Sequence, residues 1–224
     1  LVHKVEGGRI AVGRALHNVK AGFTSDRLRI ALLSMFLFSG GFTFFTSFFG
    51  VYLRNNFGFN ASKTGDYFAY VGIFIAFAQA VIVRKVAPRL PDWKVLRFSM
   101  FGTAAVLAIF FFAPAGNNLW VYLPVPFFAA FNGLSMANSQ SLISRSAEMG
   151  KQGEAMGISS SVSSLAQVPA SVLVGYITSG ITSAQPLIVA SLCITAGGLV
   201  FLLFFKPTYV NDAPVGSAPA GASH

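Results

Sequence analysis

Six long apolar runs alternate with short polar connections along the chain. A helix needs about 20 apolar residues, with about 17 to 25 as the usual range, to cross the roughly 30 Å hydrocarbon core of a bilayer. The runs are close to this length, with boundaries that are good to a few residues. The six predicted spans are Leu28 to Leu53, Tyr67 to Val83, Val95 to Ala113, Leu119 to Gln140, Met156 to Thr178 and Ala184 to Phe205. The pattern therefore predicts an all-α integral membrane protein with six transmembrane helices.

The composition points to the same class of protein. The 224 residues are 54% hydrophobic and 10% charged, and their mean hydropathy is +0.64. Soluble domains average roughly 45 to 50% apolar and about 25% charged residues. A chain with so few charges cannot cover a single core with a polar surface, so we expect its apolar surface to meet membrane lipid.

The basic residues predict the orientation in the membrane. A formal charge of +9 would suggest nucleic acid if the charge lay on one face of a polar domain, but Lys and Arg lie in the connections between apolar runs. Fourteen of the 16 fall on one side of the predicted membrane, and Arg54 and Lys63 fall on the other. The positive side is the cytoplasmic one. We therefore predict a multi-pass protein of a plasma or bacterial inner membrane, with both termini cytoplasmic and no nucleic-acid partner.

The two ends of the chain differ from its apolar centre. Residues 1–27 are a predicted cytoplasmic linker, residues 28–206 the six-helix transmembrane domain, and residues 207–224 a disordered cytoplasmic tail rich in Pro, Gly, Ala and Ser. In the linker, apolar residues from Val12 to Phe23 recur at helical spacing, which indicates either an amphipathic helix on the inner leaflet or a solvated linker. The chain begins with Leu1, and we interpret it as a fragment of something longer.

Charged residues avoid the middle of every predicted span. Asp66, Glu148 and Glu154 lie at span ends, and the three His residues lie outside the spans. Charge within the hydrocarbon is costly, so intramembrane acids and bases usually mark function. The sequence also lacks hydrolytic triads, zinc-site spacings and paired intramembrane aspartates. We therefore expect no enzymatic activity, metal or cofactor, and a proton gradient is the energy source that the sequence leaves open.

Uncharged polar residues form stripes on the first, fourth and fifth spans. An apolar span needs such residues only where it meets another helix or a watery cavity. The substrate-cavity candidates are Gly40, Thr43, Phe44, Asn132, Ser135, Met136 and Gln167. For the Ser, Thr and Gly positions, close helix packing is the stronger alternative. For the two amide side chains, which have four hydrogen-bonding positions each, cavity lining and helix packing are equally supported.

Glycine and phenylalanine give the first span two further features. The Gly40 and Gly41 pair can permit a bend, and mid-membrane helix breaks often line substrate sites in transporters. Phe36, Phe44 and Phe48 fall at helical spacing. They could form an aromatic wall against a substrate, but lipid-facing filler is the commoner interpretation for any one Phe in this chain.

Three local patterns resemble a known family. One is the connection after the second span, where basic residues surround a Pro91 and Asp92 turn, and another runs from Asn132 through Leu142 to Arg145 and on to Gly153 and Gly157. Both resemble the C-terminal half, spans seven to twelve, of major facilitator superfamily transporters. The loop from Phe57 to Phe59 resembles the tetracycline and multidrug efflux branch. The predicted cytoplasmic loop motif consists of Gln79, Arg84, Arg89, Lys94 and Arg145.

This resemblance implies a fold and a function. The six spans would be two inverted three-helix repeats, half of a major facilitator fold, with the first and fourth spans lining a central cavity and the third and sixth outside. The implied function is secondary active transport of a small molecule, as an efflux antiporter working by alternating access. The implied partners are membrane lipid, the small-molecule substrate and a missing N-terminal six-helix half. The alternatives are a complete six-helix transporter that dimerises and a polytopic membrane protein that does not transport.

Overall fold

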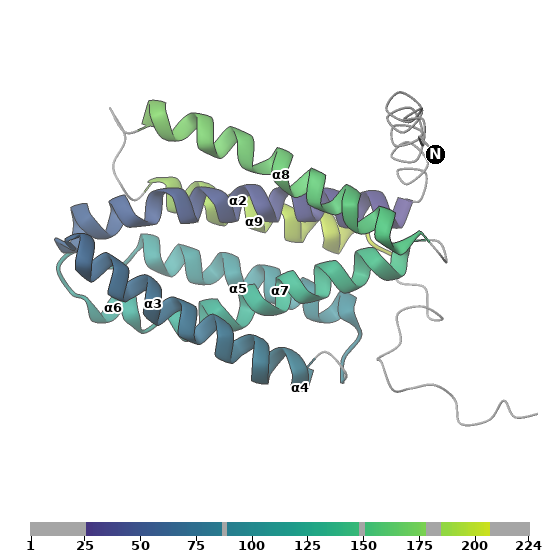
Figure 1. Ribbon diagram of the computed structural model, residues 1–224, viewed down its shortest axis with the longest axis horizontal. Coiled ribbons are helices and arrows are strands. Elements are labelled where there is room, and N and C mark those ends of the chain that lie inside the picture. Colours follow the sequence, from purple (N-terminus) through teal and green to yellow (C-terminus); the bar gives the residue numbers. More distant parts are fainter. Residues whose placement is uncertain (1–25, 87–88, 148–150, 178–184, 207–224) are drawn as a thin grey trace, which may run out of the picture.

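The computed structural model describes residues 26–86, 89–147, 151–177 and 185–206, and within these residues every regular element is a helix (Figure 1). The elements are α2 (Asp26–Phe57), α3 (Ala61–Phe77), the π-helix η1 (Ala78–Val83), α4 (Arg84–Val86), α5 (Asp92–Phe111), α6 (Leu119–Tyr122), α7 (Val125–Ser146), α8 (Gln152–Ile177) and α9 (Gln185–Phe204). The predicted linker, up to residue 25, and the predicted tail lie outside the described residues, so both remain predictions.

Each predicted span corresponds to a helix of the bundle. Five helical segments in the described chain are long and apolar enough to cross a membrane, namely Arg27–Phe57, Ala61–Val86, Asp92–Phe111, Leu119–Ser146 and Gln185–Phe204. The predicted fifth span coincides with α8, which has 26 residues and is not among these five. Five of the six predicted spans are therefore confirmed as candidate spans, and the crossing by α8 stays a prediction.

The second span begins earlier than its hydropathy predicts. The chain turns at Gly58, whose φ of 65° is in the left-handed region that glycine tolerates, and α3 then starts at Ala61 rather than at Tyr67. The side chain of Asn60 caps this start by accepting a hydrogen bond from the backbone N–H of Lys63 at 2.9 Å. A helix can thus extend beyond its apolar run when a polar cap satisfies its first turn.

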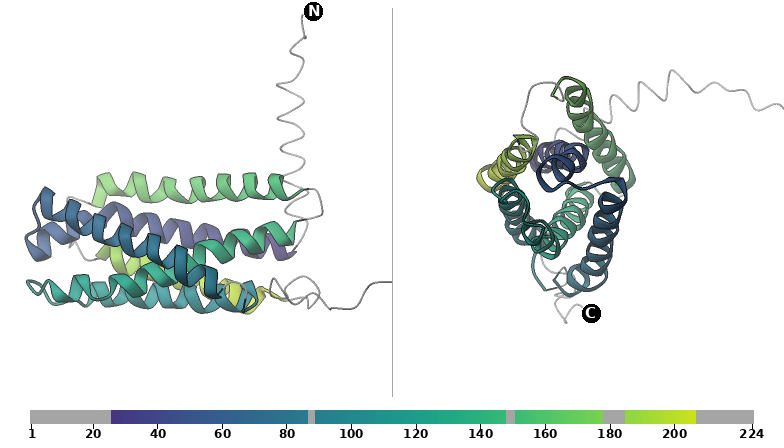
Figure 2. Two further views of the ribbon diagram at one scale, coloured as in Figure 1. Left: turned by 60° about the horizontal axis from the view of Figure 1, so that its bottom comes forward. Right: turned by 90° about the vertical axis from the view of Figure 1, so that its left-hand side faces the viewer.

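The helices pack in a definite set of pairs (Figure 2). The most extensive contact joins α2 to α9, and α5 packs broadly on both α7 and α9. On the outside of this group, α8 packs on α2, while α3 and η1 pack mainly on α7. The predicted third and sixth spans, α5 and α9, therefore bury one face in the bundle and expose apolar residues on the other, including Phe98 and Leu192.

Two glycines of α2 allow close contacts with neighbouring helices. A Cβ atom on Gly41 would lie 2.8 Å from both the carbonyl oxygen of Ala190 and Cγ1 of Ile194 on α9. A Cβ atom on Gly40 would lie 3.3 Å from the carbonyl oxygen of Ala166 on α8. The glycine pair does not interrupt the helix, because α2 continues as one α-helix through it. The glycines instead let neighbouring helices approach the backbone, as small residues do between membrane helices.

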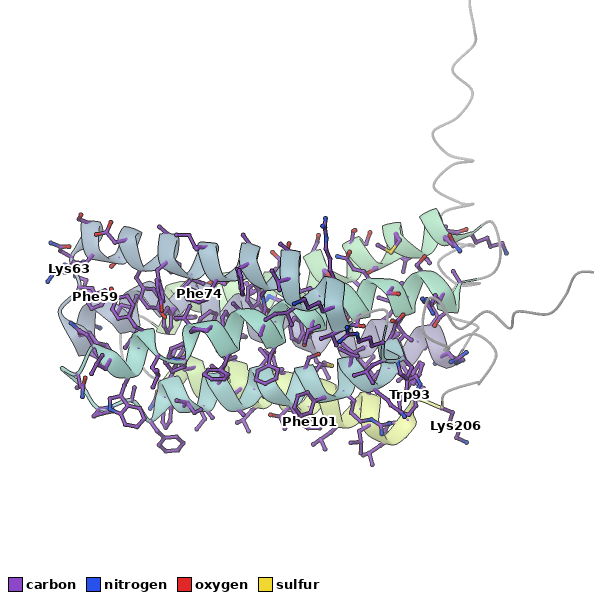
Figure 3. All side chains as sticks on the ribbon, turned by 90° about the horizontal axis from the view of Figure 1, so that it is seen from below. Phe59, Lys63, Phe74, Trp93, Phe101 and Lys206 are labelled. Carbon is purple, nitrogen blue, oxygen red and sulfur yellow. The ribbon has the colours of Figure 1, made fainter. Side chains whose placement is uncertain are left out.

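Charged residues separate toward the two ends of the bundle. Lys63 lies at one end, which we call the Lys63 end, and Trp93 and Lys206 lie near the other, the Trp93 end (Figure 3). At the Lys63 end, the buried rings of Phe49, Tyr67 and Phe110 pack together, and the Tyr67 hydroxyl donates a hydrogen bond to the carbonyl of Val121 at 3.2 Å. This aromatic cluster connects α2, α3, α5 and α6 across one end of the bundle.

Candidate functional site

The hydroxyl stripe of α2 is largely satisfied within the bundle. The Thr43 hydroxyl donates to the carbonyl of Ser39 at 2.8 Å, and the Thr46 hydroxyl is 3.2 Å from the carbonyl of Phe42. The Ser39 hydroxyl reaches across to Ser163 on α8 at 3.3 Å. These hydroxyls therefore join α2 to itself and to α8, which is the packing role that short polar residues serve in membrane helices.

Phe44 belongs to the interior of the bundle. It is 9% exposed and stacks on Phe48, which is 3% exposed, with ring centroids 6.3 Å apart. For these two residues, lipid-facing filler is the wrong interpretation. In a membrane chain, apolar residues face both lipid and the core, so helical spacing alone could not distinguish the two positions.

Buried polar residues lie along α7, and one of them reaches α5. The Ser135 hydroxyl, which is fully buried, donates to the Ser99 hydroxyl at 2.9 Å. Asn132 is 3% exposed, and its Oδ1 atom accepts no hydrogen bond from the described residues. Asn138, six residues further along α7, donates through Nδ2 to the carbonyl of Leu134 at 2.7 Å. Helix α7 thus makes one hydrogen bond to α5 and carries two buried amide oxygens, those of Asn132 and Asn138, that accept no hydrogen bond from the described residues.

The remaining cavity candidates are exposed rather than buried. Met136 on α7 and Gln167 on α8 are exposed on the surface of the bundle, as is Gln79 in η1. Several other uncharged polar residues on the same elements or on α2 are also exposed: Thr46, Ser47, Gln140, Ser160, Ser161 and Ser164. The structure therefore divides the predicted residues into a buried group that includes Asn132, and an exposed group that includes Gln167.

An ion pair ties α5 to α7 at the Trp93 end. Asp92, the first residue of α5, is 6% exposed. Its Oδ2 atom lies 3.3 Å from Nε of Arg145 and accepts a hydrogen bond from the Ser141 hydroxyl at 2.5 Å. Of the residues in the predicted loop motif, Arg145 thus contacts the buried Asp92, whereas Arg84, Arg89 and Lys94 are exposed. The role of Asp92 was missed from the sequence. An acidic residue at the start of a helix and close to basic residues was the pattern that could have indicated it.

Comparison with known proteins adds the family. The model of a family described as the Major Facilitator Superfamily matches residues 4–171, well over half of the chain. The chain belongs to the major facilitator superfamily. The resemblance of the loop and fourth-span patterns is therefore confirmed at the level of the superfamily. The five candidate spans agree with this membership, because major facilitator proteins are multi-pass membrane proteins.

Two curated relatives extend the comparison. They are the proteins named Hippocampus abundant transcript-like protein 1 from Mus musculus and from Rattus norvegicus, each 30% identical to this major facilitator chain over 133 residues. The aligned part is 59% of this chain and 25% of each relative. The match thus spans about a quarter of the relatives' length. Which half of the fold the chain represents, and which branch it belongs to, stay predictions.

Proposed function

We propose that this major facilitator chain supplies the second six-helix half of a transporter that exports a small, partly apolar molecule by alternating access. Family membership supports membrane transport of a small molecule. In major facilitator folds, the substrate binds near the membrane midplane between two rocking halves. The choice of half and the outward direction come from the sequence resemblance and belong to the proposal.

One observation carries the proposed repeat structure, namely the packing pattern of the helices. We take α2, α3 with η1, and α5 as one triplet, and α7, α8 and α9 as the other. In this arrangement α2 corresponds to α7, α3 with η1 corresponds to α8, and α5 corresponds to α9. The contact of α2 with α9 then has its counterpart in the contact of α7 with α5. The contact of α2 with α8 has its counterpart in the contact of α7 with α3 and η1. The contacts of α5 with α9 and of α2 with α7 map onto themselves. A chain that crosses the membrane three times ends on the side opposite to its start. The second triplet would therefore begin on the opposite side of the membrane from the first, and the two repeats would be inverted.

The polar residues support a cavity along α2, α7 and α8. Exposed Gln and Ser side chains gather on these helices, whereas lipid requires an apolar surface. Asn132 offers a buried Oδ1 acceptor, and an unsatisfied buried acceptor costs about 1 to 3 kcal/mol. A hydrogen-bond donor on a substrate, reaching Asn132 when the halves open, would relieve that cost.

Ion coupling in this proposal rests on the other half. The acidic residues of the described spans lie at helix ends: Asp66 in the second turn of α3, Asp92 at the start of α5 and Glu154 in the first turn of α8. Proton coupling by a mid-membrane carboxylate would therefore need an acid in the six-helix half that precedes this one.

The first prediction concerns the two amides. We expect Gln167→Leu and Asn132→Leu to lower transport roughly tenfold, as the loss of one substrate hydrogen bond of about 1.4 kcal/mol would do. The measurement is uptake by the full-length protein in liposomes, under an imposed proton gradient, across a panel of dyes and sugars. Val168→Leu, at an exposed apolar position of α8 beside Gln167, is the matched control and should transport normally.

Thermal unfolding distinguishes transport from packing in the same variants. If both amides serve the cavity, the unfolding temperatures should match that of the wild type while transport falls. Unchanged transport in both amide variants would make these residues helix-packing groups. Absence of uptake for every compound in the panel by the wild-type protein would count against the proposed transport itself.

A further inference from the structure

A groove on the outside of the bundle lies between α5 and the α6–α7 segment. It has a volume of about 460 Å³, within the roughly 300 to 1,000 Å³ of small-molecule sites. Its walls include Gly102, Ala105 and Ile109 of α5, Trp120 of α6, and Phe127 and Phe131 of α7. The lining is almost wholly apolar, so a ligand here would be held by hydrocarbon contact rather than by hydrogen bonds.

The groove is built by the close packing of Phe131 on a glycine. A Cβ atom on Gly102 would lie 2.6 Å from ring atoms of Phe131, so this ring rests against the bare backbone of α5. The ring of Phe98 meets Phe131 edge-on, with centroids 5.7 Å apart. Phe131 lines the groove beside Gly102, near the middle of α5, and the groove extends from there along the second half of α5 toward the Lys63 end.

The surroundings of the groove indicate that it faces membrane lipid. The groove lies in two of the candidate spans, Asp92–Phe111 and Leu119–Ser146. Large apolar side chains on its rim are open to the exterior: Leu123 is 69% and Phe127 is 60% exposed. Away from the helix ends, the exposed polar side chains of the described residues lie instead on α2, η1, α7 and α8, and α5 lies on the side of the bundle away from α8 (Figure 2). The groove therefore faces hydrocarbon, away from the proposed transport cavity.

The charge and the aromatic residues at the mouth of the groove indicate which kind of lipid headgroup fits there. The sequence from Phe111 to Leu123, which joins α5 to α6 at the Lys63 end, contains no Lys, Arg, Asp or Glu. Trp120 lines the mouth and is 46% exposed, and indole rings favour the headgroup level of a bilayer. An anionic headgroup would find no basic partner in this segment, whereas a zwitterionic headgroup needs none.

We propose that this groove binds one hydrocarbon chain of a zwitterionic phospholipid from the membrane leaflet at the Lys63 end. The chain lies between α5 and α7 against Phe127 and Phe131, and the headgroup rests beside Trp120. The site is separate from the transport cavity, so it does not depend on the proposed transport activity. A lipid bound there would fill the outward-facing space between α5 and the α6–α7 segment.

The experiment uses the full-length protein in detergent micelles that contain a phosphatidylcholine with a diazirine at the end of one acyl chain. After irradiation, mass spectrometry of peptides locates the label. We expect labelling of residues 102–109 and 120–131 to exceed that of the exposed α9 residues Leu192 and Leu199 at least fivefold. Ala105→Phe, which fills the groove from an exposed position, should reduce groove labelling at least threefold. Val189→Phe, on the lipid-facing surface of α9, should leave it unchanged.

Competition tests the site without any substitution. Excess unlabelled phosphatidylcholine should reduce groove labelling at least threefold, and the same mole fraction of phosphatidylglycerol should compete less well. Equal labelling of all lipid-facing helices, or groove labelling that neither Ala105→Phe nor unlabelled phosphatidylcholine reduces, would overturn the proposed site. Stronger competition by phosphatidylglycerol would overturn the proposed headgroup.

Discussion

Replacing Gly41 with valine is expected to remove most of the folded protein, because α9 leaves no room for a side chain on this face of α2. A Cβ atom would lie 2.8 Å from the Ala190 carbonyl oxygen, and backbone cannot move aside as a flexible side chain can. Overpacking typically costs about 1 to 3 kcal/mol, and here the obstacle is a backbone atom in the most extensive helix contact of the bundle. We therefore expect a loss at the upper end, about 3 kcal/mol or more.

The matched control is Gly72→Val in α3. Nothing lies within 4 Å of a Cβ atom built on Gly72, and both substitutions carry the same helix propensity. The measurement is the fraction of monodisperse protein after heating, followed by size-exclusion chromatography. Equal loss in the two variants would show that valine itself, rather than the contact of α2 with α9, is responsible.

The second large effect is expected from Arg145→Leu. This substitution leaves the Asp92 carboxylate, whose side chain is 8% exposed, without the cation that lies 3.3 Å away. Removing one partner of a buried ion pair costs about 3 to 5 kcal/mol. Arg145 is 28% exposed and solvent screens part of the interaction, so we expect the lower value, about 3 kcal/mol. For a chain of this size that corresponds to about 6 to 12 °C in the unfolding midpoint.

Two variants test the cause of this loss. Arg89→Leu removes an exposed basic residue at the same end of the bundle and should leave the midpoint within a degree or two. The double variant Asp92→Asn/Arg145→Leu removes the uncompensated charge but keeps an acceptor for Ser141, so it should recover more than half of the loss. The ion pair would be irrelevant to stability if the double variant were as unstable as Arg145→Leu alone.

Much of the fold follows from the sequence because membrane helices obey a simple length rule. Apolar runs located every long helix of the described residues, and the start of α3 was misplaced because the polar cap Asn60 extends this helix. The hydrophobic rule does not determine which apolar face meets lipid. Phe44 and Phe98 are equally apolar, yet one is buried and the other is 69% exposed.

The candidate site was less predictable because it depends on contacts between distant segments. Ser135 meets Ser99, 36 residues earlier, and Asp92 meets Ser141, 49 residues later. No local pattern encodes these distances, since tertiary packing alone brings the helices together. Sequence reasoning therefore found Asn132 and Gln167 as polar residues in apolar spans but could not show that one is buried and the other exposed.

The packing of α2 has a consequence for how a ribosome and a membrane insertase would build this protein. The helix enters the membrane first among the described spans, yet its main partners, α8 and α9, are the last to be synthesised. Likewise, the main packing partner of α3, helix α7, is synthesised after it. Until α9 arrives, Gly41 faces a gap, and the early helices depend on lipid or on a chaperone for cover. The bundle is thus completed only after synthesis of its final helix, and a nascent chain that stops before α9 would be a natural substrate for membrane quality control.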